Sequence, residues 1–328
     1  MPQLSLIEAE DLVAAALERC RTSPENARSV ARALVAAEAD GLSGHGLSRV
    51  ASYAAQAKAG KVDGFATPSA TRPRPAVLAV DAAHGFAYPA LELAVRELPA
   101  VAREAGIAAA PIRRSHHAGA AGHPVERLAE AGLVAILLAN TPAAIAPWGG
   151  DRALFGTNPI AFAAPRERGA PIVVDLSLSK VARGNILAAK QKGQPIPEGW
   201  AFDAQGRPTT DPDAALKGTM APLGDAKGTA LALMVELLAA GLTGATYAAD
   251  ASSFLDAHGP PPGTGQLLLA FDPAALGGGA ERFEALAGAV QAQAGARLPG
   301  ARRLDLRRRA QAEGIAVADA TLAAIRAL

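Results

Sequence analysis

The stretch GHGLSRVASYAAQAKAG, residues 44–60, places three functional side chains on one expected helix. Side chains at i, i+4 and i+8 share a face of an α-helix, so His45, Arg49 and Tyr53 are predicted to point the same way. A proton donor, a cation that can pair with a carboxylate and a phenol on one ridge suit the binding and reduction of a small acid. The alternative is that Arg49 and Tyr53 form a solvated face and that His45 is a loop residue.

Two further helices are predicted before this stretch. Ser5 and Glu8 form a capping-box pattern before an apolar repeat. Ser23 followed by Pro24 is typical of a second helix start, and Gly41 is the expected stop. Residues 1–60 are therefore interpreted as three helices with short connections.

Beyond a Pro-rich link at residues 67–75, strand and helix signals alternate. Helices are expected at 86–106 and 227–242, and Pro99 is expected to end or kink the first of them. This interleaving indicates an α/β or α+β layered fold. Long loops are expected at 195–212 and 245–265, and a helical end follows from residue 279. The expected strands are 76–80, 107–112, 133–138, 160–163, 172–174 and 266–271.

Composition excludes several classes of function. The 328 residues hold 32 Lys and Arg against 31 Asp and Glu, so the net charge of +1 gives no reason to expect nucleic acid or an anionic membrane as partner. No apolar run is long enough to span a membrane. The single Cys20 and the acidic N-terminal segment favour a cytoplasmic protein.

Polar residues in the expected connections are candidates for chemistry. His116, His117 and His123 precede a helix start, where free N–H groups bind anions, and their spacing matches no standard metal site. Thr157 and Asn158 lie at a turn that is either structural or functional. Asp175 ends a buried strand and is either a ligand contact or a cap. Lys227 starts an apolar helix, where the dipole favours acids, and so mildly favours a ligand role. No G-x-G-x-x-G follows a strand, so the sequence itself names no cofactor.

The chain resembles the malate/L-lactate dehydrogenase family of the non-Rossmann type. The resemblance runs nearly end to end and rests on motifs in the right order: DGLSGHGLSRVASY, GKVDG, SHHAGAAGH, APWGG, LFGTNPIAFAAP, VVDLSLSK, IPEGWAFDAQGRPTTDP and DAKGTALALMVELL. It implies NADP or NAD as cofactor, with NADPH slightly favoured, and a fold with a mixed, largely antiparallel sheet. It also implies a homodimer and a helical domain of residues 1–72 with 276–328 beside an α/β domain of 73–275.

The resemblance also implies roles for particular residues. His45 matches the acid/base histidine, and Arg49 would hold the substrate carboxylate. His117 matches a second catalytic histidine, while Tyr53 and Thr157 are expected to contact substrate. Cofactor contacts are expected at Gly119, Asp175, Leu176, Ser177, Asn185 and Lys227, with Arg302 and Arg303 as candidates for the 2′-phosphate of NADPH.

Three departures from the family pattern shape the choice of substrate. Gly44 replaces a Ser before the histidine, and Asn185 aligns with the Asp that completes a Ser–His–Asp relay in the cyclic-imine reductases. Ala118 stands where an aromatic residue is usual. The missing relay favours a 2-oxo acid and 2-hydroxy acid pair of the sulfolactate, malate or lactate type, with a cyclic-imine (Δ1-piperideine- or Δ1-pyrroline-2-carboxylate) reductase as the alternative. Gly44 and Ala118 together predict a roomier pocket and a substrate bulkier than lactate or malate.

Overall fold

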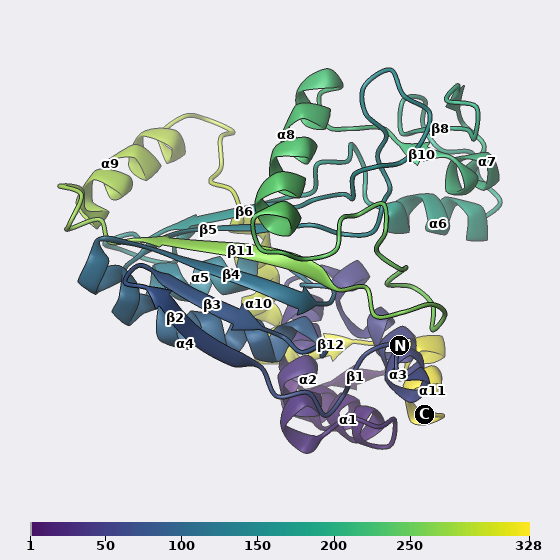
Figure 1. Cartoon of the computed structure of the whole chain (residues 1–328), viewed down its shortest axis with the longest axis horizontal. Helices are drawn as coiled ribbons and strands as arrows, with labels where there is room; N and C mark the ends of the chain where they lie inside the picture. The colour runs from purple at the N-terminus through teal and green to yellow at the C-terminus, as the bar shows by residue number, and fades with distance from the viewer. Residues whose placement is uncertain (1) are drawn as a thin grey trace.

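The computed structural model describes residues 2–328 and begins with three helices packed on one another (Figure 1). Ser5 and Glu8 form the predicted capping box, in which each side chain accepts a hydrogen bond from the backbone N–H of the other. Ser23 caps the second helix, and Gly60 ends the third at φ 74°. The three predicted helices are confirmed as α1 Leu6–Glu18, α2 Pro24–Ala39 and α3 Val50–Ala59.

The predicted helical ridge from His45 to Tyr53 is wrong, because the chain bends at Gly46. Two single 3-10 turns, Ser43–His45 and Leu47–Arg49, precede the start of α3. A Cβ at position 46 would lie 2.2 Å from the carboxylate of Glu38, so glycine is required for this close approach. The turn, and not helical periodicity, therefore positions His45.

A seven-stranded sheet forms the centre of the molecule in the order β2-β3-β4-β11-β5-β6-β7. Only β3 and β4 pair in parallel; the other neighbours are antiparallel, which confirms the mixed, largely antiparallel sheet. The bounds are β2 Ser69–Arg74, β3 Val77–Asp81, β4 Ile107–Ser115, β5 Val134–Ala139, β6 Ile160–Ala164, β7 Ile172–Leu176 and β11 Thr264–Phe271.

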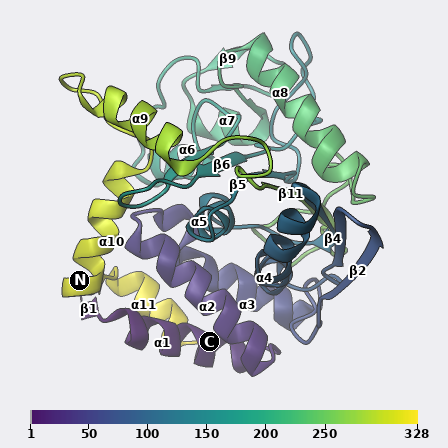
Figure 2. The same ribbon diagram turned by 90° about the vertical axis from the view of Figure 1, so that its left-hand side faces the viewer.

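Helices cover the two faces of this sheet unequally. On one face, α4 (Ala87–Ala105) and α5 (Gly122–Glu130) pack on the larger apolar core (Figure 2). On the other face lies α8 (Ala226–Glu236), which continues as one π-helical turn. Successive side chains of a strand point to opposite faces, and accordingly Leu268 joins the first core whereas Leu267 joins the core beneath α8.

The structure differs from expectation in the Pro-rich and loop segments. Residues 69–74 form strand β2, whose Pro73 is tolerated because β2 is an edge strand. Helix α4 continues through Pro99 instead of ending there. The expected loop at 195–212 contains β8 (Ala201–Phe202) and β9 (Pro208–Thr209) of a small sheet. That sheet is completed by β10 Thr219–Met220, with α6 Arg183–Gln191 and α7 Pro212–Lys217 beside it.

The C-terminal part returns to the N-terminal helices, as the resemblance implies. Strand β12 (Ile315–Ala316) pairs with β1 (Gln3–Leu4), and one apolar core unites the N-terminal helices with Leu322 and Ile325. The division at residues 1–72 with 276–328 and 73–275 stays a prediction. No helix within residues 2–328 is long and apolar enough to cross a membrane. The remaining helices are α9 Ala280–Gln291, α10 Ala301–Glu313 and α11 Asp319–Arg326.

Candidate active site

His45 meets His117 where the turn before α3 approaches the segment that follows β4. The two rings stack, with centroids 5.2 Å apart and an angle of 15° between the ring planes. The Nδ1 atom of His45 is buried without a hydrogen-bond partner among residues 2–328, and the side chain as a whole is partly exposed. The Nε2 atom is therefore the ring nitrogen available to a ligand. The structure thus brings together the two histidines that were predicted to be catalytic.

Two buried tyrosine hydroxyls hold His117. The Oη atom of Tyr53 lies 2.6 Å from Nδ1 of His117 and 3.1 Å from Oη of Tyr88. Burial raises the pKa of both tyrosines, so both keep their protons at neutral pH. We assign the Tyr88 hydroxyl as the donor to the Tyr53 hydroxyl, and the Tyr53 hydroxyl as the donor to Nδ1 of His117. In this chain of donors, Nε2 of His117 carries the ring proton and is an N–H donor. Tyr53 is fully buried in this chain, and its predicted contact with substrate stays untested.

Burial and nearby positive charge keep the site histidines neutral. Burial, followed by the charges of Arg49 and His123, lowers the pKa of His45 to about 4. Burial and Arg49 also hold the pKa of His117 well below its usual range. At neutral pH His45 is therefore an imidazole that can accept a proton.

Arg49 is the cation of the site. Its Nε–H donates to the backbone oxygen of Gly44 at 2.6 Å, and the side chain is partly exposed. No ion pair of Arg49 is formed within residues 2–328. The remaining guanidinium N–H groups are free to bind a carboxylate, which Arg can do through two parallel hydrogen bonds.

The wall behind the histidines uses residues that sequence reasoning missed. Nε2 of His116 lies 2.9 Å from Oε1 of Gln56, and the ring of Phe254 packs at 5.0 Å from His116 and 5.3 Å from His117. The buried Lys61 holds the loop that carries Phe254, because its Nζ donates to the backbone oxygen of Ser253 at 2.6 Å. The long loop was predicted, but nothing in its sequence signalled where it would pack.

The turn between β5 and β6 supplies Thr157 and Asn158. The Thr157 hydroxyl lies 3.3 Å from that of Thr141 and is partly exposed. Asn158 is buried and donates to the backbone oxygen of Ala232 and to Glu236, so its role is structural. The contact of Thr157 with substrate stays a prediction.

Asp175 and Gly119 shape the start of α5. The Asp175 carboxylate accepts the Gly122 N–H at 2.8 Å, and burial raises the pKa of this carboxyl although part of the side chain reaches solvent. Gly119 has φ 69°, and a Cβ there would lie 2.6 Å from the Tyr88 hydroxyl. At the end of β7, Leu176 is exposed, and the Ser177 hydroxyl lies 2.7 Å from that of Ser179.

Other predicted site residues lie on exposed surfaces. Lys227, in the first turn of α8, is exposed and forms no ion pair within residues 2–328, and Asn185 is exposed on α6. Arg113 and Arg114 both pair with Asp81 on the surface. Ala118 lines a cavity that His45 does not line, and its effect on the space at the histidines stays a prediction.

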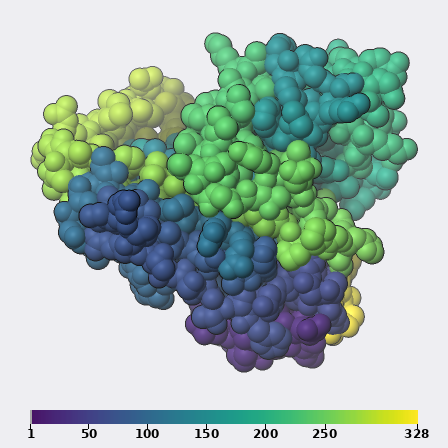
Figure 3. Space-filling model, viewed as in Figure 1, coloured from purple at the N-terminus to yellow at the C-terminus, as the bar shows by residue number. Residues whose placement is uncertain are grey.

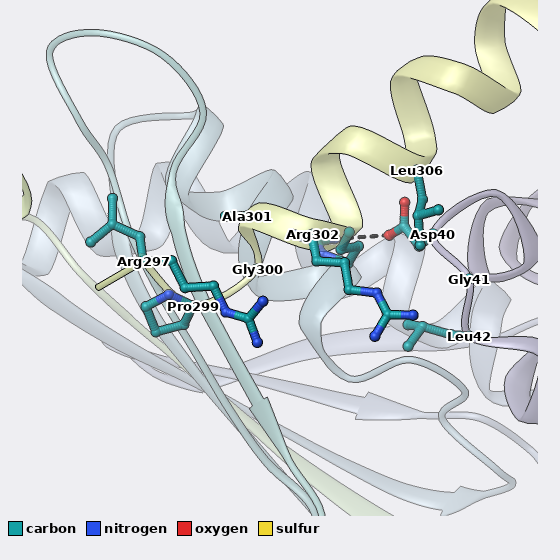
Figure 4. A pocket seen from close by; sticks show the side chains of 11 residues that line it. Asp40, Gly41, Leu42, Arg297, Pro299, Gly300, Ala301, Arg302 and Leu306 are labelled. Atoms are coloured by element: carbon teal, nitrogen blue, oxygen red, sulfur yellow. Dashed lines mark hydrogen bonds and ion pairs between the residues drawn. The ribbon is translucent and has the colours of Figure 1, made fainter. Parts of the chain in front are cut away.

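The predicted phosphate-binding arginines occupy two different environments. Arg303 is committed to a buried ion network, in which it pairs with Asp40 at 3.0 Å and with Glu126 at 2.7 Å. Arg302 is exposed and borders a cavity of about 430 Å³ between residues 40–42 and the start of α10 (Figure 4). Arg297 borders the same cavity, and neither Arg302 nor Arg297 forms an ion pair within the described residues 2–328. Both are therefore free to bind an anion.

Comparison with known proteins identifies the family. A family model described as malate/L-lactate dehydrogenase matches residues 4–326. The chain belongs to this family. It is 54% identical to the (2R)-3-sulfolactate dehydrogenase (NADP(+)) of Chromohalobacter salexigens, over 99% of this chain and 97% of the relative. It is 41% identical to the Δ1-pyrroline-2-carboxylate reductase of Ancylobacter novellus, over 99% and 97%.

A solved structure of the same family has the same fold. The Δ1-piperideine-2-carboxylate reductase of Pseudomonas syringae superposes with a TM-score of 0.94 at 40% identity, over 100% of this chain and 99% of that one. In this malate/L-lactate dehydrogenase family member, a neutral histidine lies beside an arginine that forms no ion pair within residues 2–328. The relatives are dehydrogenases and reductases, in agreement with an oxidoreductase.

Proposed function

We propose that this chain is an NADP-dependent oxidoreductase that interconverts a 2-oxo acid and a 2-hydroxy acid of the sulfolactate type. The observation that carries the proposal is the neutral, accessible His45 beside Arg49, a cation without an ion pair within residues 2–328. The sulfolactate dehydrogenase relative at 54% identity supports the substrate class and the choice of NADP.

His45 moves the proton in this reaction. In oxidation, neutral His45 would take the proton of the substrate hydroxyl at Nε2; NADP, when bound, would supply the hydride acceptor. Arg49 holds the substrate carboxylate. The negative charge of the carboxylate offsets the positive charge of Arg49, which together with burial lowers the pKa of His45. Substrate binding therefore raises the proton affinity of His45 at the moment when it must take up a proton, and in reduction the same proton returns to the carbonyl oxygen.

The arginine-lined cavity of Figure 4 fits the phosphate end of the cofactor. Arg297 and Arg302 are free cations at its rim, and the first N–H groups of α10, a helix of 13 residues, lie beside it. We infer that Arg302 contacts the 2′-phosphate of NADPH. Arg303 supports this site through its ion pairs with Asp40 and Glu126 instead of binding the phosphate itself. The proposal predicts a higher KM for NADPH and little change for NADH in Arg302→Gln.

Reduction of a cyclic imine is the second candidate, because the Ancylobacter and Pseudomonas relatives are named for it. The missing relay speaks against it, since Nδ1 of His45 has no partner within residues 2–328 and Asn185 is exposed on α6. A Cβ at position 44 would meet nothing within 4 Å, so Gly44→Ser is sterically tolerated. We expect Gly44→Ser with Asn185→Asp to raise imine turnover more than turnover of oxo acids.

We also infer a cytoplasmic homodimer. Helix α8 and the π-helical turn after it expose Leu231, Leu233, Met234 and Leu237, each at least 39% accessible. The green segment that contains α8 lies on the surface shown in Figure 3. Apolar side chains concentrated in this way mark a contact surface. The single cysteine, Cys20, is buried and free, in keeping with a reducing compartment.

A substrate panel tests the proposed function. NADPH oxidation would be followed by absorbance with sulfopyruvate, oxaloacetate, pyruvate, a bulky 2-oxo acid and a cyclic imine carboxylate. We expect sulfopyruvate to give the highest kcat/KM. A higher value for the imine would overturn the proposal in favour of the second candidate. A clear preference for pyruvate over the bulky acid would refute the roomier pocket that Gly44 and Ala118 together predict.

A further inference from the structure

A second cavity, of about 770 Å³, lies on the side of the sheet where α2, α4 and α5 meet. Figure 2 shows these three helices below the sheet and away from α8. The volume of the cavity falls within the range of small-molecule binding sites. Neither His45, Arg49 nor His117 lines this cavity, which adjoins the candidate active site only through Tyr88 and the segment after His117.

The cavity is lined by both apolar and charged side chains. Its apolar lining consists of short or branched aliphatic side chains from the three helices and from the segment before α5, namely Ala33, Ala36, Leu91, Val95, Ala118 and Pro124. The charged lining consists of arginines and glutamates of these helices and of α10, namely Arg32, Arg96, Arg127, Arg307, Glu92, Glu126 and Glu130. An apolar body and a charged head would both find partners in such a site.

Most of these charges already pair with one another. Arg32 pairs with Glu92 at 2.9 Å, and Arg307 pairs with Glu126 at 2.8 Å. The side chain of Arg127 forms neither an ion pair nor a hydrogen bond within residues 2–328, and it is exposed. The described partner of Arg96 is its exposed neighbour Glu97, outside the cavity.

One acid of the lining is also unpaired. Glu130 has no partner within the described chain and stands one helical turn after Arg127. Arg127 is unpaired within residues 2–328, and Arg96 is held only by a surface ion pair with Glu97 at 3.2 Å, which contributes little. Both guanidinium groups can therefore turn toward a ligand with a single negative group.

We propose that this cavity binds a small amphipathic monocarboxylate. The carboxylate lies against Arg127 and Arg96, where the guanidinium groups can form charge-assisted hydrogen bonds. The apolar body lies against Leu91, Val95 and Ala118. The proposal rests on this cavity alone and does not depend on the proposed oxidoreductase function.

The cavity also touches the support of His117. Tyr88 lines it, and the Tyr88 hydroxyl lies 3.1 Å from that of Tyr53, which in turn is 2.6 Å from Nδ1 of His117. Ala118, on the opposite wall, directly follows His117 in the chain. A ligand that shifts Tyr88 or Ala118 therefore changes the position of His117, so binding is expected to alter turnover.

Isothermal titration with octanoate, in the absence of cofactor and substrate, tests the proposal. We expect saturable binding to the wild-type protein and none of octanamide, which lacks the charge. Arg127→Gln should weaken binding at least about tenfold, as expected for loss of a charge-assisted contact. Ala118→Phe should abolish binding by filling the cavity, and Arg309→Gln, which removes an exposed arginine of α10, should leave it unchanged.

Three outcomes would overturn the proposal. The first is no saturable binding of octanoate by the wild type. The second is binding that is unchanged in Arg127→Gln. This result would overturn the proposal even if Ala118→Phe fails to fold. The third is binding that is lost in Arg49→Gln but kept in Arg127→Gln, which would place the acid beside His45 instead.

Discussion

The proton affinity of His45 is set by the groups around it. Burial and the neighbouring charge of Arg49 lower the pKa of His45 to about 4. A base must be unprotonated to act, so kcat/KM for hydroxy-acid oxidation should be level from about pH 8 to pH 5 and fall as the pH drops below 5. Arg49→Gln removes the second cause, and the midpoint of the fall should move to higher pH.

A pH profile of kcat/KM for the wild type and Arg49→Gln measures this shift of the midpoint. Arg49→Gln should also have a higher KM for the substrate, because it loses the contact with the carboxylate. Identical midpoints in the wild type and Arg49→Gln would show that Arg49 does not tune His45. A profile that falls near pH 6.5 in the wild type would show that the histidine is less buried than the structure indicates.

Tyr53 acts on catalysis through His117. Tyr53→Phe keeps the ring, which packs on Phe86 with centroids 5.5 Å apart, but removes the hydroxyl that bonds Nδ1 of His117. Loss of one hydrogen bond of about 1 kcal/mol predicts a drop of about fivefold to tenfold in kcat with little change in the KM for NADPH. Tyr88→Phe, which removes the outer hydroxyl, is the matched control and should have a smaller effect. An equal or larger effect of Tyr88→Phe would contradict the assigned chain of donors.

At the scale of the element, the segment between β4 and α5 depends on one glycine. Gly119 and Gly132 flank α5 and both have positive φ, but a Cβ at 119 would meet the Tyr88 hydroxyl whereas one at 132 would meet nothing within 4 Å. Gly132→Ala should lower the free energy of unfolding by about 1 kcal/mol, because it adds only backbone strain. Gly119→Ala adds the clash with the Tyr88 hydroxyl and should lower the free energy of unfolding by about 1–3 kcal/mol more. Chemical denaturation of both variants measures the difference, and equal losses would contradict the contact with Tyr88.

Helices and strands were predictable where their signals are local. The Ser5–Glu8 and Ser23–Pro24 caps predicted two helix starts, because a cap depends on residues a few positions apart. Pro99 does not end α4, which runs on to Ala105, so of the two expected effects only a kink stays a prediction. The bond between Tyr53 and His117 joins residues 64 positions apart, and the packing of Phe254 on His116 depends on a long loop. Such contacts follow from the sheet topology and leave no mark in residue spacing.

At the scale of the whole molecule, the apolar face of α8 predicts how two copies meet. Leu237 is 53% exposed there, and a charge in a buried interface without a partner is costly. Leu237→Glu should convert the dimer into a monomer in analytical ultracentrifugation. Leu286→Glu, on the exposed side of α9, is the control and should leave the dimer intact. A wild-type protein that is monomeric at all concentrations would refute the dimer, and dissociation by Leu286→Glu alone would place the interface on α9.

The measurement that tests the central claim most directly is the turnover of (2R)-3-sulfolactate with NADP by the wild type and His45→Gln. Gln keeps a polar side chain of similar reach but cannot take up a proton. Removal of a general base predicts a fall in kcat of about 10²–10⁴-fold. Binding of NADPH and the melting temperature should be unchanged, since Nδ1 of His45 makes no hydrogen bond within residues 2–328. Turnover of His45→Gln within a few-fold of the wild type would contradict the account, because another group would then carry the proton.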